Sequence, residues 1–284
     1  MKRTIDLKNP SYEKQAAVYA PDGAAPRAAV LYFHGGGLLY GQREDLPDAH
    51  IDAFTGAGFA VIAFDYPLAP AADLDLILKD VRESVDTFIE KPEAFGLPKD
   101  LPYFLWGRSA GAYLALMTGA AKDLGRNPAG ILSYYGYGFL TDRWDDVPSP
   151  YYSTLPAVNK NAFDAVPQHL HADGPMATHF CLYVYARQTG SWRKLIYKGR
   201  DKFFYLNDTL RTVDQLSAPL FAAHAIADPD VPFAEFTALC NKFHPKQRYV
   251  DAGDVHDFDR ETSTPAAKNV LKKSLAFIES CLSV

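Results

Sequence analysis

The sequence predicts an α/β protein built on a mainly parallel sheet with helices on both faces. Two observations lead to this prediction: short apolar runs recur along the chain, and segments with helical periodicity separate them. Strands that are apolar on both faces belong to sheets buried from both sides, and their alternation with helices is typical of parallel sheets. The strands are expected at residues 28–34, 59–65, 102–107, 130–136, 218–224 and 247–252.

The predicted helices lie between these runs. The longest follows Asp73, whose side chain is suited to cap a helix, and runs to about Glu90 with Leu74, Ile77 and Val81 at core-facing spacing. The other helices are expected at residues 46–55, 110–124, 233–243 and 266–282.

One region, residues 139–216, interrupts the alternation. It is rich in aromatic residues, proline, aspartate and arginine, and a structureless loop of that length is uncommon inside a compact domain. We therefore expect a core domain formed by residues 1–138 and 217–284, with residues 139–216 inserted as a cap or lid that has helices of its own.

Composition narrows the classes of partner. The chain has 284 residues and a formal net charge of -5, without a basic cluster that would attract nucleic acid or an anionic membrane. No apolar run is long enough to span a bilayer, and the first residues are too polar for a signal peptide, so a cytoplasmic location is expected. The three cysteines follow no disulfide or zinc pattern, and nothing in the sequence sets an oligomeric state.

The segment "YFLWGRSAGAYLALMTG" contains G-x-S-x-G, with Ser109 at its centre. An apolar strand ends at Gly107 and a small-residue helix follows the serine, which is the strand, sharp turn and helix of a nucleophile elbow. The alternative is a tight turn with a serine that caps the helix. The surrounding pattern favours a catalytic serine.

A serine hydroxyl needs a base and a group that orients the base. His256 lies in a loop after the last expected strand, and Asp228 lies just beyond the strand ending at His224. This gives the chain order Ser, acid, His. Other acids fit the role less well: Asp230 is expected to be a cap or turn residue, Asp254 and Asp257 are expected to be solvated neighbours of the histidine, and the less favoured sources after the preceding strand are Asp142, Asp145 and Asp146.

Five segments together resemble the α/β hydrolase superfamily and, within it, the hormone-sensitive-lipase-like, HGGG-type carboxylesterases. They are "HGGG" (34–37), "FDYPLAP" (64–70), "GRSAG" (107–111), "DPDVP" (228–232) and "VHDF" (255–258). The resemblance implies an α/β-hydrolase fold, Ser109 as nucleophile, His256 as base and then acid, and Asp228 as the orienting carboxylate.

The resemblance also assigns an oxyanion hole to the backbone N–H groups of Gly35, Gly36 and Ala110. It implies structural roles for Asp65 and His34, while Gly37 and Gly41 are expected only to let the loop turn. The sequence departs from the family pattern at two positions, Arg108 before the serine and Pro67 in "DYPLAP". These departures bear on which substrate is bound and leave the catalytic residues unchanged.

These residues predict a serine hydrolase that cleaves a small carboxylic ester, of a short acyl chain or an aromatic group, without metal or organic cofactor. We expect Tyr40, Arg108, Trp144 and Tyr183 to contact the substrate. A peptidase, an amidase or an arylformamidase-like enzyme would use the same triad. A non-catalytic binding protein is disfavoured because every triad member is present, and a lyase or perhydrolase use of the elbow is a further, less favoured reading.

Overall fold

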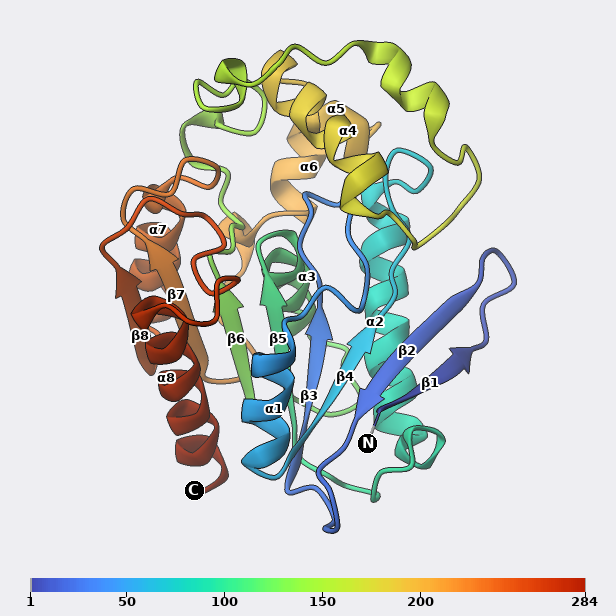
Figure 1. The fold of residues 1–284 in the computed structure, drawn as a ribbon, viewed down its shortest axis with the longest axis vertical. Helices are drawn as coiled ribbons and strands as arrows, with labels where there is room; N and C mark the ends of the chain where they lie inside the picture. Colours follow the sequence, from blue (N-terminus) through green and yellow to red (C-terminus); the bar gives the residue numbers. More distant parts are fainter. Residues whose placement is uncertain (1, 284) are drawn as a thin grey trace.

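The computed structural model describes residues 2–283, whose strands form one eight-stranded sheet in the order β1-β2-β4-β3-β5-β6-β7-β8 (Figure 1). From β4 to β8 across the sheet the neighbours are parallel, while β1 and β2 join antiparallel at one edge. The strands are β1 (Lys2–Leu7), β2 (Lys14–Tyr19), β3 (Ala28–Phe33), β4 (Phe59–Phe64), β5 (Tyr103–Arg108), β6 (Gly130–Tyr134), β7 (Leu220–Ala225) and β8 (Gln247–Asp251). The predicted fold class is confirmed.

The N-terminal hairpin of β1 and β2 is the part of the sheet that the sequence patterns miss. β1 is mostly exposed and pairs only with β2, so its sequence "KRTIDL" carries no buried apolar run. β2 is mostly buried, but its apolar stretch is only "AAVY". The strand begins with Lys14, whose Nζ lies 2.7 Å from Oδ1 of the buried Asp80. A lysine with a buried carboxylate partner is indistinguishable from a surface lysine in the sequence.

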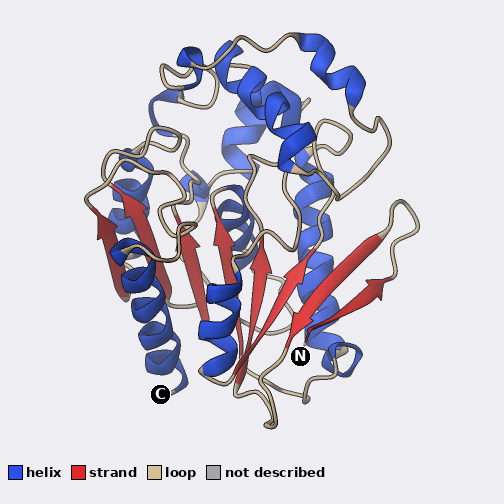
Figure 2. Ribbon diagram, in the orientation of Figure 1, coloured by secondary structure: helices blue, strands red, loops and turns tan. Residues whose placement is uncertain are grey.

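Helices cover both faces of the sheet, and alternate side chains of each strand therefore meet a different helix layer (Figure 2). Leu31 and Ile62 face the layer that contains α2 (Leu74–Glu90), α3 (Ala110–Gly119) and α7 (Phe233–Phe243). Val30 and Val61 face α1 (Asp48–Gly56) and α8 (Pro265–Leu282). α3 ends at Gly119, five residues before its expected end, and the chain turns there toward β6.

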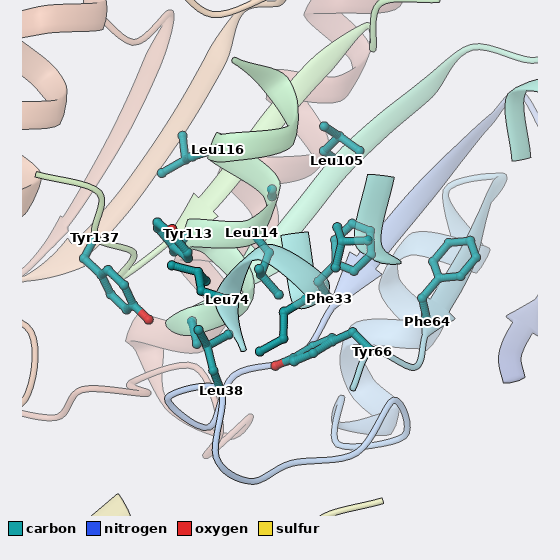
Figure 3. Packing of buried hydrophobic residues seen from close by; sticks show 14 of the residues in the cluster. Phe33, Leu38, Phe64, Tyr66, Leu74, Leu105, Tyr113, Leu114, Leu116 and Tyr137 are labelled. Carbon is teal, nitrogen blue, oxygen red and sulfur yellow. The ribbon is translucent and has the colours of Figure 1, made fainter. Parts of the chain in front are cut away.

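The core reaches the carboxyl ends of the strands, where the loops gather. Figure 3 shows Tyr113 of α3 beside Tyr137 of the loop after β6, and Tyr66 next to the loop that carries Leu38. The rings of Tyr113 and Tyr137 stack with centroids 5.2 Å apart, which is within the range of favourable aromatic pairs. The loops at the carboxyl ends of the strands therefore pack against buried aromatic side chains.

Residues 139–216 lie above the carboxyl ends of the strands and carry three α-helices (Figure 1). These are α4 (Met176–Thr189), α5 (Trp192–Ile196) and α6 (Asp201–Asn207). The insertion touches the glycine-rich loop through a two-way backbone bridge: the Gly41 N–H donates to the Gly174 carbonyl at 2.7 Å, and the Gly174 N–H donates to the Gly41 carbonyl at 3.1 Å. Within residues 2–283 no helix combines the length and apolarity needed to cross a membrane.

Candidate active site

Ser109 occupies a strained turn between β5 and α3. Its backbone lies at φ 53° and ψ -117°, a conformation that non-glycine residues rarely adopt and that clusters at functional sites. The turn is close-packed: a Cβ on Gly107 would lie 2.0 Å from the Gly111 carbonyl oxygen, and one on Gly111 would lie 2.0 Å from the Phe33 carbonyl oxygen. Only glycine fits at both positions, which explains the spacing of the pentapeptide.

The structure brings Ser109, His256 and Asp228 into one hydrogen-bonded chain. Nε2 of His256 lies 2.8 Å from Oγ of Ser109, and Nδ1 of His256 lies 2.7 Å from Oδ2 of Asp228. The three residues come from three loops that follow the carboxyl ends of the parallel strands β5, β7 and β8. The arrangement places the imidazole next to the serine hydroxyl, and the carboxylate orients the imidazole through its other nitrogen, as nucleophilic catalysis requires.

Asp228 is held rigidly at the start of the loop after β7. Its Oδ1 accepts hydrogen bonds from the backbone N–H groups of Asp230, at 2.8 Å, and Val231, at 3.0 Å. Burial alone would raise the pKa of Asp228, but the neighbouring His256 and His224 hold it below its ordinary value. This carboxylate therefore stays ionised and turned toward His256.

His256 lies in the loop between β8 and α8, with 18% of its side chain exposed. Burial disfavours the charged imidazolium, yet the carboxylate of Asp228 outweighs burial and raises the pKa of His256 above its ordinary value. The edge of the Tyr135 ring supports the imidazole, with centroids 4.8 Å apart. His256 is thus a strengthened base that lines the cavity and remains partly exposed.

The loop after β3 places Gly35 and Gly36 beside Ser109. A Cβ on Gly35 would lie 3.1 Å from the Arg108 carbonyl oxygen and 3.4 Å from Cβ of Ser109, so the two loops are in contact. Within residues 2–283, the N–H groups of Gly35, Gly36 and Ala110 donate to no backbone or side-chain acceptor. These donors are thus available beside the serine, as an oxyanion hole requires.

His34, Tyr66 and Asp65 hold this loop from below. The Tyr66 hydroxyl donates to the carbonyls of His34, at 2.9 Å, and Gly35, at 3.2 Å, and its ring stacks on the buried His34 imidazole. Asp65 accepts hydrogen bonds from Arg43 and from the Gln15 backbone N–H at 2.9 Å. The structural roles implied for His34 and Asp65 agree with these contacts.

Gly41 is more constrained than the sequence suggests. Its φ is 116°, and a Cβ there would lie 2.3 Å from Nδ1 of His34 and 2.8 Å from the Gly35 carbonyl oxygen. Gly36, at φ 102°, excludes a Cβ with similar severity, because the Tyr40 carbonyl oxygen would lie 1.9 Å away. Neither position has room for alanine, whereas the sequence predicts that alanine at Gly36 lowers turnover far more than alanine at Gly41.

A small cavity of about 100 Å³ opens above Ser109 and His256. Of the residues expected to contact the substrate, Tyr40, Arg108 and Tyr183 line it. Trp144 lies outside it: its indole N–H donates to Glu235 of α7 and its ring stacks on Trp192 of α5, so it packs between the core and residues 139–216. The remaining lining includes the glycine loop with Gln42, Asp45, Tyr135, Met176, Asp230, Asp257 and Arg260.

Arg108 forms part of a buried ionic cluster that sequence reasoning misses. Its Nε donates to the Tyr135 hydroxyl at 2.6 Å and its guanidinium lies 3.1 Å from Oδ1 of Asp259, while Nε2 of His50 lies 2.8 Å from Oδ2 of the same aspartate. Asp259 follows "VHDF" by one residue, but its partners are 124 to 209 positions away in the chain. No local signal connects them.

A family model described as "alpha/beta hydrolase fold" matches residues 30–199 of the chain. A kynurenine formamidase of Danio rerio is 34% identical over 102 residues, which cover 35% of this chain. The match spans about a third of that relative (32%).

Two solved structures are similar over nearly the whole chain. One is a protein of unknown function from Staphylococcus aureus subsp. aureus Mu50, with a TM-score of 0.85, 26% identity and 99% of each chain covered. The other is EstE1, a thermostable carboxylesterase from a metagenomic library, with a TM-score of 0.71, 19% identity and coverage of 99% of this chain and 89% of that one. The protein is a hydrolase. It belongs to the α/β hydrolase superfamily and, within it, to the hormone-sensitive-lipase-like family.

Proposed function

We propose that the protein is a carboxylesterase that hydrolyses small esters through Ser109, His256 and Asp228. The observation that carries the proposal is the hydrogen-bonded chain from Ser109 Oγ through His256 to Asp228, with contacts of 2.8 and 2.7 Å, beside three free backbone N–H groups. This combination supplies a nucleophile, a base, an orienting group and donors for a developing negative charge.

In the first half of the proposed cycle, His256 Nε2 takes the proton of Ser109 while Oγ forms a bond to the ester carbonyl carbon. Asp228 keeps the proton on Nδ1 and stabilises the imidazolium that results. The tetrahedral intermediate collapses, the bond to the alcohol oxygen breaks, and Nε2 gives its proton to that oxygen. Water then attacks the acyl enzyme by the same route and releases the acid.

The N–H groups of Gly35, Gly36 and Ala110 are the proposed oxyanion donors. They need no reorganisation at the moment of reaction, because Gly35 already touches the elbow and Ala110 begins α3. Loss of one such donor typically lowers turnover by about 100- to 1000-fold.

The size and lining of the cavity support a small, partly polar substrate. A volume of about 100 Å³ is far below that of a typical drug-sized pocket, and its lining mixes tyrosine rings with arginine and aspartate side chains. A short acyl group fits this description better than a long aliphatic chain does.

Labelling with a fluorophosphonate, followed by peptide mass spectrometry, tests the assignment of the nucleophile. We expect the label on Ser109, and we expect Ser109→Ala to abolish labelling and to lower ester turnover by about 10⁴-fold or more. Because Ser109 lies at a strained turn, urea unfolding of both proteins would establish that the variant is folded. Label on another residue, or no label on folded wild-type protein, would contradict the assignment of Ser109 as the nucleophile.

An amidase that acts on a small aryl amide is the second candidate, and the similarity to a formamidase over 102 residues favours it. Both activities use the same nucleophile, so substrate comparison separates them. Turnover of 4-nitrophenyl acetate should exceed that of 4-nitroacetanilide and of formanilide if the protein is an esterase. A higher kcat/KM for formanilide than for the ester would assign the amidase instead.

A further inference from the structure

A second carboxylate approaches the imidazole of His256 from the side of the cavity. Oδ2 of Asp230 lies 3.8 Å from Nε2 of His256, the nitrogen that faces Ser109. Asp230 is buried, lines the cavity, and is distinct from Asp228, which contacts Nδ1 on the opposite side of the ring.

The insertion holds this second carboxylate in place. The Tyr183 hydroxyl donates to both oxygens of Asp230, at 2.8 and 3.1 Å, and Nε of Arg187 lies 3.4 Å from Oδ1. The Arg187 guanidinium also donates to the Asp230 backbone carbonyl at 3.3 Å. Both residues belong to α4, so residues outside the core fix a charged group at the reacting nitrogen.

We infer that Asp230 is a positioning residue that, together with Asp228, stabilises the imidazolium formed when His256 takes the proton of Ser109. The inference rests on the proposed function for its catalytic consequence. Its physical basis is that an ionised carboxylate 3.8 Å from a protonated ring nitrogen in a partly buried site favours the charged form of the ring.

Other charged groups near His256 have partners of their own. Asp257, the next residue, pairs with Arg260. The Arg108 guanidinium pairs with Asp259, and Asp45 accepts a hydrogen bond from the Tyr32 hydroxyl at 2.7 Å. Tyr135 contributes only its ring edge, because its hydroxyl donates to Asp259. Asp230 also has a cationic partner in Arg187, but its Oδ2 lies 3.8 Å from Nε2 of His256. This proximity, rather than the lack of a partner, is what lets its charge act on the ring, and the raised pKa of His256 is consistent with it.

Titration of the His256 imidazole by NMR in the resting protein tests the inference without requiring activity. The pKa of His256 should fall by about half a unit or more in Asp230→Asn, because one of the carboxylate charges that favour the protonated ring is lost. Asp230→Glu keeps the negative charge, so the pKa of His256 should stay close to its wild-type value. This variant also changes the fit to Tyr183, so it serves as a control for the structural disturbance in Asp230→Asn. Asp254→Asn removes an exposed charge two residues from His256 and should change the titration little.

The pH profile gives the catalytic readout. For the wild type, kcat/KM should rise with pH along an acid limb centred above the ordinary histidine value of about 6.5, because only neutral His256 can accept the serine proton. In Asp230→Asn this limb should move to lower pH while kcat on the plateau falls several-fold, and KM should change less.

An unchanged titration, or an equal shift in Asp230→Asn and Asp230→Glu, would overturn the inference, as would a loss of kcat with an unmoved pH profile. If Asp230→Asn unfolds, Asp230→Ser removes the same charge without placing amide hydrogens beside Arg187 and should give the same shift. Failure of Ser109 labelling would overturn the esterase proposal, whereas the NMR titration would still report on Asp230.

Discussion

At the scale of single residues, the identity of Arg108 is explained by what lies beneath the elbow. Its side chain is 2% exposed, and its Nε and one terminal guanidinium nitrogen donate to Tyr135 and Asp259. Asp259 is fully buried and also contacts His50. A buried charge cluster of this kind depends on every member, because removal of one leaves another charge without a partner.

We predict that Asp259→Asn destabilises the protein by about 3 to 5 kcal/mol, because it leaves the Arg108 guanidinium buried without its carboxylate. Urea unfolding measures this loss, and Asp254→Asn in the same loop, which is exposed, should cost less than about 0.5 kcal/mol. Equal costs for the two variants would contradict the prediction.

The same residue makes stability depend on pH. Burial would raise the pKa of Asp259, but Arg108 and His50 hold it below its ordinary value. Its contribution to the free energy of unfolding is therefore complete above about pH 4 and is lost as the pH falls further, through the lower pKa of the folded state. Below pH 4 the wild type should lose more stability than Asp259→Asn does.

The site residues illustrate what local patterns can predict. Ser109, Asp228 and His256 each follow an apolar strand, and the structure places them within hydrogen-bonding distance; their catalytic role remains a proposal. Asp230 lies inside the segment "DPDVP" and Asp259 directly follows "VHDF", but their contacts are with α4 and β5, which are distant in sequence. Patterns of spacing identify groups attached to one strand and miss contacts between distant segments.

At the scale of elements, helix α7 fastens both ends of residues 139–216. Glu235 accepts hydrogen bonds at the start, from the N–H groups of Gly138 at 3.0 Å, Phe139 at 2.8 Å and Thr141 at 2.5 Å. Lys242, two turns later, donates to the carbonyls of Leu210 and Arg211 near the end. One core helix thus contacts residues 139–216 near both of their ends, in addition to the bridge between Gly41 and Gly174.

We predict that Glu235→Gln destabilises the protein by about 2 kcal/mol and speeds tryptic cleavage within residues 139–216. Among residues 2–283, four of the five contacts of the carboxylate are with N–H groups, and the fifth, the Thr141 hydroxyl, is the one group there that could accept from an amide nitrogen, so the amide leaves buried N–H groups unpaired. Glu279→Gln is the matched control, since its pair with Arg27 is exposed and should contribute less than about 1 kcal/mol. Unchanged cleavage of the insertion in Glu235→Gln would contradict the proposed anchoring.

At the scale of the whole molecule, the first two strands contribute unequally to stability: the edge strand β1 contributes little, whereas its neighbour β2 contributes much. β1 is mostly exposed and contacts β2, whereas β2 supplies the buried Ala16, Ala17 and Val18 and places Lys14 against Asp80. Removal of β1 therefore exposes a strand edge, but removal of both strands opens the core.

We predict that deletion of residues 2–7 lowers the free energy of unfolding by about 1 kcal/mol, while deletion of residues 2–19 lowers it by more than about 4 kcal/mol. The larger cost arises because Asp80 loses its cation and the apolar faces of β4 and α2 become exposed. Thermal and urea unfolding of the two truncated chains compare these costs. Similar losses in both would show that β1 carries the stability.

The sequence predicts six of the eight strands, five of them because their apolar runs are buried on both faces, as in β3 and β5, whereas β8 is partly exposed and has a weaker pattern. It did not predict the hairpin, since β1 is polar and the burial of Lys14 depends on Asp80. The end of α3 was also misplaced, because Ala120 and Ala121 favour a helix locally although the chain turns at Gly119.

The two-way bridge between Gly41 and Gly174 has a consequence for engineering and for divergence between relatives. It joins the glycine loop and the insertion as neighbouring strands are joined, so each segment is fitted to the backbone path of the other. A chimaera that receives only the insertion of a relative would have to rebuild this pairing beside the serine. The two segments should therefore be transplanted together, and they should be inherited as one unit even though 132 residues separate them.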